Sequence, residues 1–185
     1  MKSMIASGLA SISLALAPAT LAQPFNLDQV LSKMEQAGKS FRSLESSIER
    51  TKVTVIVNDK YVDSGKAYFD RKDKSTRIKF DFLKPEPQSL LIADGKALLY
   101  YPKIKTAQEY LLGENQDKTE FLLVGFGPSN QDIRRLYNAS LVGEEVINGK
   151  NTSVIELIPK SAQLLARFKS IRLWMEQTSW IPLQT

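Results

Sequence analysis

The sequence contains neither cysteine nor histidine. The missing cysteine excludes disulfides and thiol nucleophiles, and the missing histidine excludes imidazole bases, histidine metal ligands and imidazole pH switches. The neighbouring carboxylates Glu144 and Glu145 alternate along a predicted strand, so they point to opposite faces and form no acid/base pair. We therefore expect no enzyme, no metal and no cofactor. The core and the backbone hydrogen bonds must stabilise the fold.

The excess of positive charge is also small. Lysine and arginine number 25 against 20 carboxylates, and removing Lys2 with an N-terminal leader leaves 24 minus 20, or +4. Without a basic patch interleaved with aromatic residues, we expect no nucleic-acid partner. The weak charge fits either approach to anionic headgroups or an acidic partner, or an ordinary solvated surface of mixed sign.

Residues 1–22 have the pattern of a secretory signal peptide. Lys2 precedes an apolar stretch, and Thr20 and Ala22 are small residues at the positions before a cleavage site. A membrane anchor is the alternative, but an apolar stretch of about fourteen residues falls short of the roughly 20 needed to span a bilayer. The next residue is Gln23 and not cysteine, so we expect an unlipidated, soluble domain over residues 23–185.

The first segment of that domain is predicted to be an amphipathic helix. Asn26 and Gln29 have capping-box spacing, Phe25 and Val30 have the spacing of a hydrophobic staple, and Gly38 is the expected exit. Helical spacing connects the apolar residues Leu27, Val30, Leu31, Met34, Ala37 and Phe41.

The remaining chain is predicted to be mainly β. Two-residue alternation begins near Leu44, and Asn58-Asp59, Asp94-Gly95 and Asn148-Gly149 are predicted hairpin turns. Two short helices are expected over 115–124 and 130–137, joined by a flexible Gly125-Phe126-Gly127, with a helical turn near 161–168. Strands are expected over 51–57, 65–69, 77–82, 89–93, 96–101, 108–112, 140–147, 152–159, 170–175 and 180–184. This order predicts an α+β fold with an antiparallel meander, curled or closed. Pattern alone leaves open whether its interior is filled or hollow.

Several short motifs occur in a recognisable order along the chain. They are Gly65, Tyr68-Phe69-Asp70-Arg71, Arg77-Ile78-Lys79-Phe80, Pro85, Gln88, Leu91-Ile92-Ala93-Asp94-Gly95-Lys96, Tyr100-Tyr101-Pro102 and Glu156-Leu157-Ile158-Pro159-Lys160. With the first helix, this series resembles the outer-membrane lipoprotein carrier family of the LolA type.

The resemblance implies an incomplete, strongly curved antiparallel β-barrel covered by short helices. In that family an apolar cavity receives the acyl chains of outer-membrane lipoproteins from an inner-membrane ABC lipoprotein-releasing transporter and passes them to an outer-membrane acceptor. It thus implies a monomeric periplasmic carrier, or chaperone. Two departures stand out: Lys72 replaces the proline that usually follows Arg71, and the family pattern continues beyond Trp180-Ile181-Pro182. We therefore expect the domain to lack its final C-terminal strands.

The resemblance and strand parity together suggest site residues. Arg71 corresponds to a family arginine that bonds to backbone carbonyls of the lid; the alternative is an exposed arginine at a strand end. The expected lid residues are Leu31, Met34, Phe121 and Leu122. The expected acyl-chain cavity is lined by Val53, Val55, Phe69, Ile78, Phe80, Ile92 and Tyr100.

Other functions remain open for this sequence. The same fold could serve a periplasmic sensor of mislocalised lipids or lipoproteins, or a carrier of another amphiphile such as a glycolipid or a pigment. A structural or protein-binding role is a further class.

Overall fold

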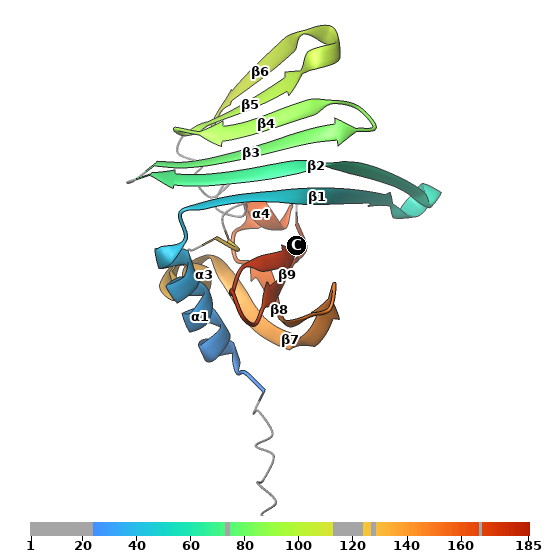
Figure 1. Ribbon diagram of the computed structural model, residues 1–185. Helices are drawn as coiled ribbons and strands as arrows, with labels where there is room; N and C mark the ends of the chain where they lie inside the picture. The colour runs from blue at the N-terminus through green and yellow to red at the C-terminus, as the bar shows by residue number, and fades with distance from the viewer. Residues whose placement is uncertain (1–23, 73–74, 113–123, 127–128, 167) are drawn as a thin grey trace, which may run out of the picture.

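The computed structural model describes residues 24–72, 75–112, 124–126, 129–166 and 168–185. The predicted leader 1–22 and most of the predicted helix 115–124 lie outside these residues. The large sheet has the order β1-β2-β3-β4-β5-β6 and the small sheet the order β10-β9-β8-β7 (Figure 1). The strands are β1 Ser43–Thr54, β2 Asp59–Lys72, β3 Ser75–Lys84, β4 Gln88–Ala93, β5 Lys96–Tyr101, β6 Thr106–Leu111, β7 Tyr137–Ile147, β8 Lys150–Pro159, β9 Ile171–Glu176 and β10 Pro182–Gln184. The helices are α1 Leu27–Ser40, α3 Asn130–Leu136 and α4 Ala162–Leu165, with 3-10 turns η1 Val55–Val57 and η2 Pro102–Ile104.

The predicted mainly β fold with an incomplete antiparallel barrel is confirmed. All strand pairs are antiparallel, and the described strands divide into two sheets that do not close on each other. Figure 1 shows the small sheet and α1 beside β1, at the opposite side of the large sheet from β6. None of the described helices is long and apolar enough to cross a membrane.

Helix α1 begins at the predicted capping box. The backbone N–H of Gln29 donates to Asn26 Oδ1, and the backbone N–H of Asn26 donates to Gln29 Oε1, each over 2.9 Å. The predicted exit at Gly38 is wrong, because the helix continues to Ser40. It ends where Phe41 turns to an extended conformation while its N–H still bonds to the Ala37 carbonyl. Gly38 thus lies inside the last turn, where it is buried.

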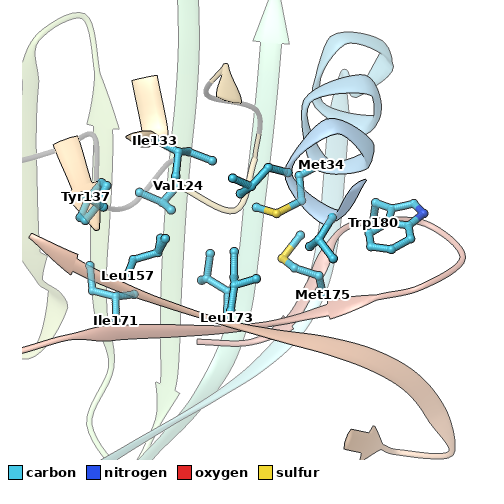
Figure 2. Close-up of a cluster of buried hydrophobic side chains, with 12 residues drawn as sticks. Met34, Val124, Ile133, Tyr137, Leu157, Ile171, Leu173, Met175 and Trp180 are labelled. Carbon is cyan, nitrogen blue, oxygen red and sulfur yellow. The ribbon is translucent and has the colours of Figure 1, made fainter. Parts of the chain in front are cut away.

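The main core lies between α1 and the small sheet. Val30 and Leu31 of α1 are fully buried, and Trp180 packs edge-on against Phe25 with ring centroids 5.0 Å apart. Figure 2 shows side chains from the two ends of the chain meeting in this cluster. Its members are Val30, Leu31, Met34, Val124, Ile133, Tyr137, Ile155, Leu157, Ile171, Leu173, Met175 and Trp180.

The tight turns follow the sequence except at the first hairpin. Asp94-Gly95 and Asn148-Gly149 have positive φ at both residues, as predicted for primed two-residue turns. The strand predicted to reach Val57 instead ends at Thr54. Residues 55–57 form a 3-10 turn, and Asn58 at φ 50° reverses the chain. The three apolar residues Val55, Ile56 and Val57 therefore lie in the turn and not in the strand that their alternation predicted.

Gly65 allows two strands to approach closely where the register between β2 and β3 shifts. A Cβ atom built on Gly65 would lie 1.9 Å from the carbonyl oxygen of Asp81. No side chain fits there without moving the backbone of β3. This contact accounts for glycine at a strand position, where it is otherwise unfavourable.

We predict that Gly65→Ala lowers the free energy of unfolding by about 2 kcal/mol, because the added methyl group forces β2 away from β3. Urea unfolding followed by circular dichroism measures the change. Ser64→Ala at the neighbouring position adds no atom and is the matched control. Equal stability of the two variants would contradict the close approach.

Candidate functional site

One face of the large sheet is mainly apolar, and we call it the inner face. Its members follow from the strand register, which places side chains in rows across the sheet. Adjacent rows are Leu44, Phe69, Ile78, Ile92, Ala97 and Tyr110, then Ser46, Ala67, Phe80, Leu90, Leu99 and Gln108. The opposite, outer face carries ion pairs such as Lys66 with Glu45 at 2.6 Å and Lys96 with Glu109 at 3.0 Å.

Four of the seven predicted cavity residues lie together on the inner face. Phe69, Ile78 and Ile92 are direct cross-strand neighbours, and Phe80 lies in the next row. Phe69 and Ile78 are buried, whereas Phe80 and Ile92 are half-buried. These four residues form a continuous apolar patch.

The structure places the other three predicted residues elsewhere. Val53 and Tyr100 point to the outer face, because their strand positions alternate with the inner-facing ones. Tyr100 pairs with Ser89, so the inner positions of β5 are occupied by Leu99 and its alternating neighbours. Val55 belongs to η1 and is 84% exposed at the end of the first hairpin.

Only two of the four predicted lid residues lie in the described part of the chain. Leu31 and Met34 are buried in the core between α1 and the small sheet. Phe121 and Leu122 lie outside the described residues. Helix α1 therefore packs on the small sheet, and its C-terminal end lies next to the inner face.

Three aromatic rings border the inner face at that end. The ring centroid of Phe69 lies 4.9 Å from that of Phe41 and 5.3 Å from that of Phe126, and Phe41 and Phe126 are 5.8 Å apart. We call Phe41, Phe69 and Phe126 the aromatic triad. Phe41 directly follows α1, Phe69 lies near the end of β2 and Phe126 lies before α3, so the triad joins distant parts of the chain.

Arg71 forms hydrogen bonds beside the aromatic triad. Its guanidinium donates to the carbonyl oxygens of Gly38 and Phe126, both over 2.8 Å, and lies 5.2 Å from the centre of the Phe69 ring. Burial and the nearby positive charge of Arg42 lower the pKa of Arg71. The group still remains protonated, because arginine does not lose its proton in proteins. Arg71 therefore connects β2 with α1 and with residue 126 through charged hydrogen bonds.

Residues 124–126 reach both sheets. Val124 is buried in the main core, and Phe126 stacks within the aromatic triad. A Cβ atom on Gly125 would lie 2.5 Å from Cγ of Pro182 in β10. The first two residues of the predicted flexible joint are thus packed, and Gly127 lies outside the described residues.

A second contact holds α1 against α3. Glu35 accepts the backbone N–H of Asn130 at 3.1 Å and pairs with Lys39 at 2.8 Å. The hydrogen bond from Lys39 and the one from Asn130 hold the pKa of Glu35 below its ordinary value. Asp28 forms an ion pair with Arg134 between the same helices.

Comparisons with solved structures agree with this architecture. MucB, known from Pseudomonas aeruginosa, matches 84% of this chain and 50% of its own, at 14% identity and a TM-score of 0.50. A putative outer membrane lipoprotein-sorting protein domain from Vibrio parahaemolyticus matches 85% of this chain and 69% of its own, at 14% identity and a TM-score of 0.45. A LolA superfamily protein from Nitrosomonas europaea also matches 85% of this chain and 69% of its own, at 13% identity and a TM-score of 0.37. The fold is thus similar to that of MucB.

Sequence comparisons are sparser. No family model matches the chain. An uncharacterized protein of Methanocaldococcus jannaschii is 23% identical over 163 residues, which is 88% of this chain. The chain spans 44% of the length of that curated relative. The similarity to solved structures is therefore one of fold alone.

The structure shows an ion pair on the inner face that the sequence did not predict. Asp63 is fully buried, and its Oδ2 accepts Nε of Arg50 at 2.7 Å. The guanidinium of Arg50 lies 3.9 Å above the Phe82 ring centroid. Burial and the Asp63 carboxylate raise the pKa of the adjacent Tyr61. Because the partners are thirteen residues apart, only the hairpin register could have revealed the pair.

No other chemical site competes with the inner face in the described part of the chain. A shallow hollow beside Ser75, Thr76, Asp94 and Gly95 lies at the turns that end β2 and β4. Among the described residues, no group of three or more carboxylates could hold a metal ion.

We predict that Asp63→Ala lowers the free energy of unfolding by about 2 kcal/mol, because it leaves the Arg50 guanidinium without its partner. The double variant Arg50→Met/Asp63→Leu replaces both charges with apolar groups and should recover most of that loss. Thermal and urea unfolding compare the two. A single variant as stable as the wild type would show that the pair carries no net stabilisation.

Proposed function

We propose that the protein is a periplasmic carrier that binds lipoprotein acyl chains against the inner face of the large sheet. The observation that supports this most is the partial burial of an apolar surface. Phe80, Leu90 and Leu99 form a row that is only half-buried, whereas the core under α1 is closed. A continuous apolar surface of this kind is characteristic of a ligand site.

The cargo explains why such a surface is needed. Each methylene group exposed to water costs about 0.8 kcal/mol, so two or three long acyl chains cost tens of kcal/mol. A lipoprotein therefore cannot cross an aqueous compartment unaided. In this proposal residues 1–22 are a cleaved signal peptide, and the monomeric domain 23–185 takes cargo from an inner-membrane ABC transporter. An outer-membrane acceptor then receives it.

The Arg71 contacts suit a site that must load and also release. Charged hydrogen bonds contribute roughly 1.5 to 3 kcal/mol each, an amount that cargo of this size can offset. Acyl chains entering beside the aromatic triad would displace Phe126 and so weaken one bond of Arg71. Reformation of that bond would favour release.

Native mass spectrometry of protein purified from a membrane-containing lysate tests the cargo. We expect a copurifying lipoprotein. A free glycolipid or pigment in its place would instead identify a carrier of another amphiphile, and the absence of any amphiphile would contradict a carrier role.

We predict that Phe80→Asp abolishes uptake of a fluorescent acyl probe, because it places a carboxylate in the middle of the inner face. Tyr100→Asp is the matched control, since Tyr100 lies on the outer face of β5 and its substitution should leave uptake unchanged. Probe fluorescence is titrated for both variants after circular dichroism shows that they fold. A folded Phe80→Asp variant that binds normally would exclude the inner face as the site.

We predict that Arg71→Leu loads lipoprotein at least as well as the wild type but fails to pass it on. The substitution removes both hydrogen bonds to backbone carbonyls and adds apolar contact with the cargo. Loading and transfer are measured separately in reconstituted membranes. Arg77→Leu is the control, because Arg77 is exposed on the outer face. Transfer at the wild-type rate by Arg71→Leu would reduce Arg71 to a structural residue.

A further inference from the structure

The first hairpin projects beyond the rest of the large sheet. Strand β3 ends at Lys84, which pairs with Ser64, so among the described strands residues 59–63 of β2 pair with β1 alone. Five residues at about 3.3 Å each give a projection of roughly 17 Å before the turn. We call residues 50–63 the arm (Figure 1).

The end of the arm is apolar and open to solvent. Val55, Ile56 and Val57 are 84%, 97% and 69% exposed. Among the other described turns between neighbouring strands, Asp94-Gly95 and Asn148-Gly149 have the polar and glycine residues usual for turns. The 3-10 turn η2 exposes one large apolar residue, Ile104, at 69%. Three consecutive exposed β-branched residues at a projecting tip are unfavourable in water and point to a binding role.

Lysines lie along the arm and at the same end of the large sheet. Lys52 and Lys60 flank the tip on the two strands of the arm, accompanied by Asp59. The turns after β3 and β5 lie at the same end of the sheet. They add Lys84, Lys103 and Lys105 against Glu86, and Lys103 and Glu86 are 2.8 Å apart. These five lysines and two carboxylates give this end of the sheet a net positive charge.

The base of the arm is firmly held. A two-stranded hairpin alone is marginally stable in water. Here Asp63 and Arg50 form the buried ion pair at the point where the arm leaves the sheet, and Arg50 stacks on Phe82 of β3. Farther out, the ammonium of Lys52 lies 5.4 Å from the Tyr61 ring centroid. The tip is thus presented at a defined distance from the inner face.

We propose that the arm docks the protein on anionic phospholipid bilayers by inserting Val55, Ile56 and Val57 among the headgroups. Three side chains are too small an area for a stable protein interface. A bilayer surface can combine the burial of a few apolar groups with about 1 kcal/mol for each nearby lysine. The tip also has Tyr61 beside it, a residue type favoured at membrane interfaces. This inference does not depend on what the inner face carries.

A single fluorophore can report insertion directly, because the chain has no cysteine of its own. Ile56→Cys labelled with an environment-sensitive dye should shift to shorter wavelength on vesicles of phosphatidylcholine with phosphatidylglycerol. The shift should be weaker on phosphatidylcholine alone and should fall as salt rises. The control is Val146→Cys, which labels a 65% exposed apolar position at the end of β7 and should not shift.

Vesicle sedimentation measures the affinity. We expect Val55→Ser/Ile56→Ser/Val57→Ser to bind phosphatidylglycerol vesicles roughly tenfold more weakly, and Val146→Ser to bind like the wild type. All substituted side chains are exposed, so the fold should survive, which circular dichroism checks.

Two results would overturn the proposal. One is an unshifted dye spectrum at residue 56 with both vesicle types. The other is a shift that appears without lipid and grows with protein concentration, since that would identify a second copy of the chain as the occupant. The carrier proposal fails separately: Phe80→Asp should still bind vesicles, and the triple serine variant should still take up the acyl probe.

Discussion

The hydrogen bonds of Arg71 couple two sheets that otherwise share no ladder among the described strands. The guanidinium lies on the large sheet and Gly38 belongs to the helix that packs on the small sheet. Phe126 lies two residues after Val124 of the main core. The position of the aromatic triad depends on this arrangement. Because arginine stays charged over the whole accessible pH range, a change of pH does not alter the charge that makes these hydrogen bonds.

The two sheets differ in how completely their apolar side chains are buried. The small sheet and α1 enclose nearly all of the completely buried apolar side chains. In the large sheet, the apolar side chains of β4 and β5 are at most half-buried. Every residue of β6 is exposed. Local stability follows the density of buried contacts, so β5 and β6 should open more readily than β8 and β9. A binding surface on the less stable sheet can adapt its shape without disturbing the core.

Local signals in the sequence were sufficient for local structure. The Asn26 capping box and the Asp94-Gly95 turn depend on residues a few positions apart, and both formed as predicted. Alternation correctly grouped Phe69 with Ile78, but it could not reveal that a 3-10 turn removes Val55 from its strand. Nor could it determine which parity of β5 faces inward or that the strands form two sheets. These features depend on register and packing between distant segments, as does the buried Arg50–Asp63 pair.

The location of the core has a consequence for how the chain is made. Helix α1 comes first in the described chain, yet its apolar stripe packs against strands that begin at residue 137. During synthesis that helix emerges long before its partner, with six strands of the other sheet between them. Contacts between such distant segments form late and slow folding. The nascent chain therefore remains without its main core until its last quarter is made.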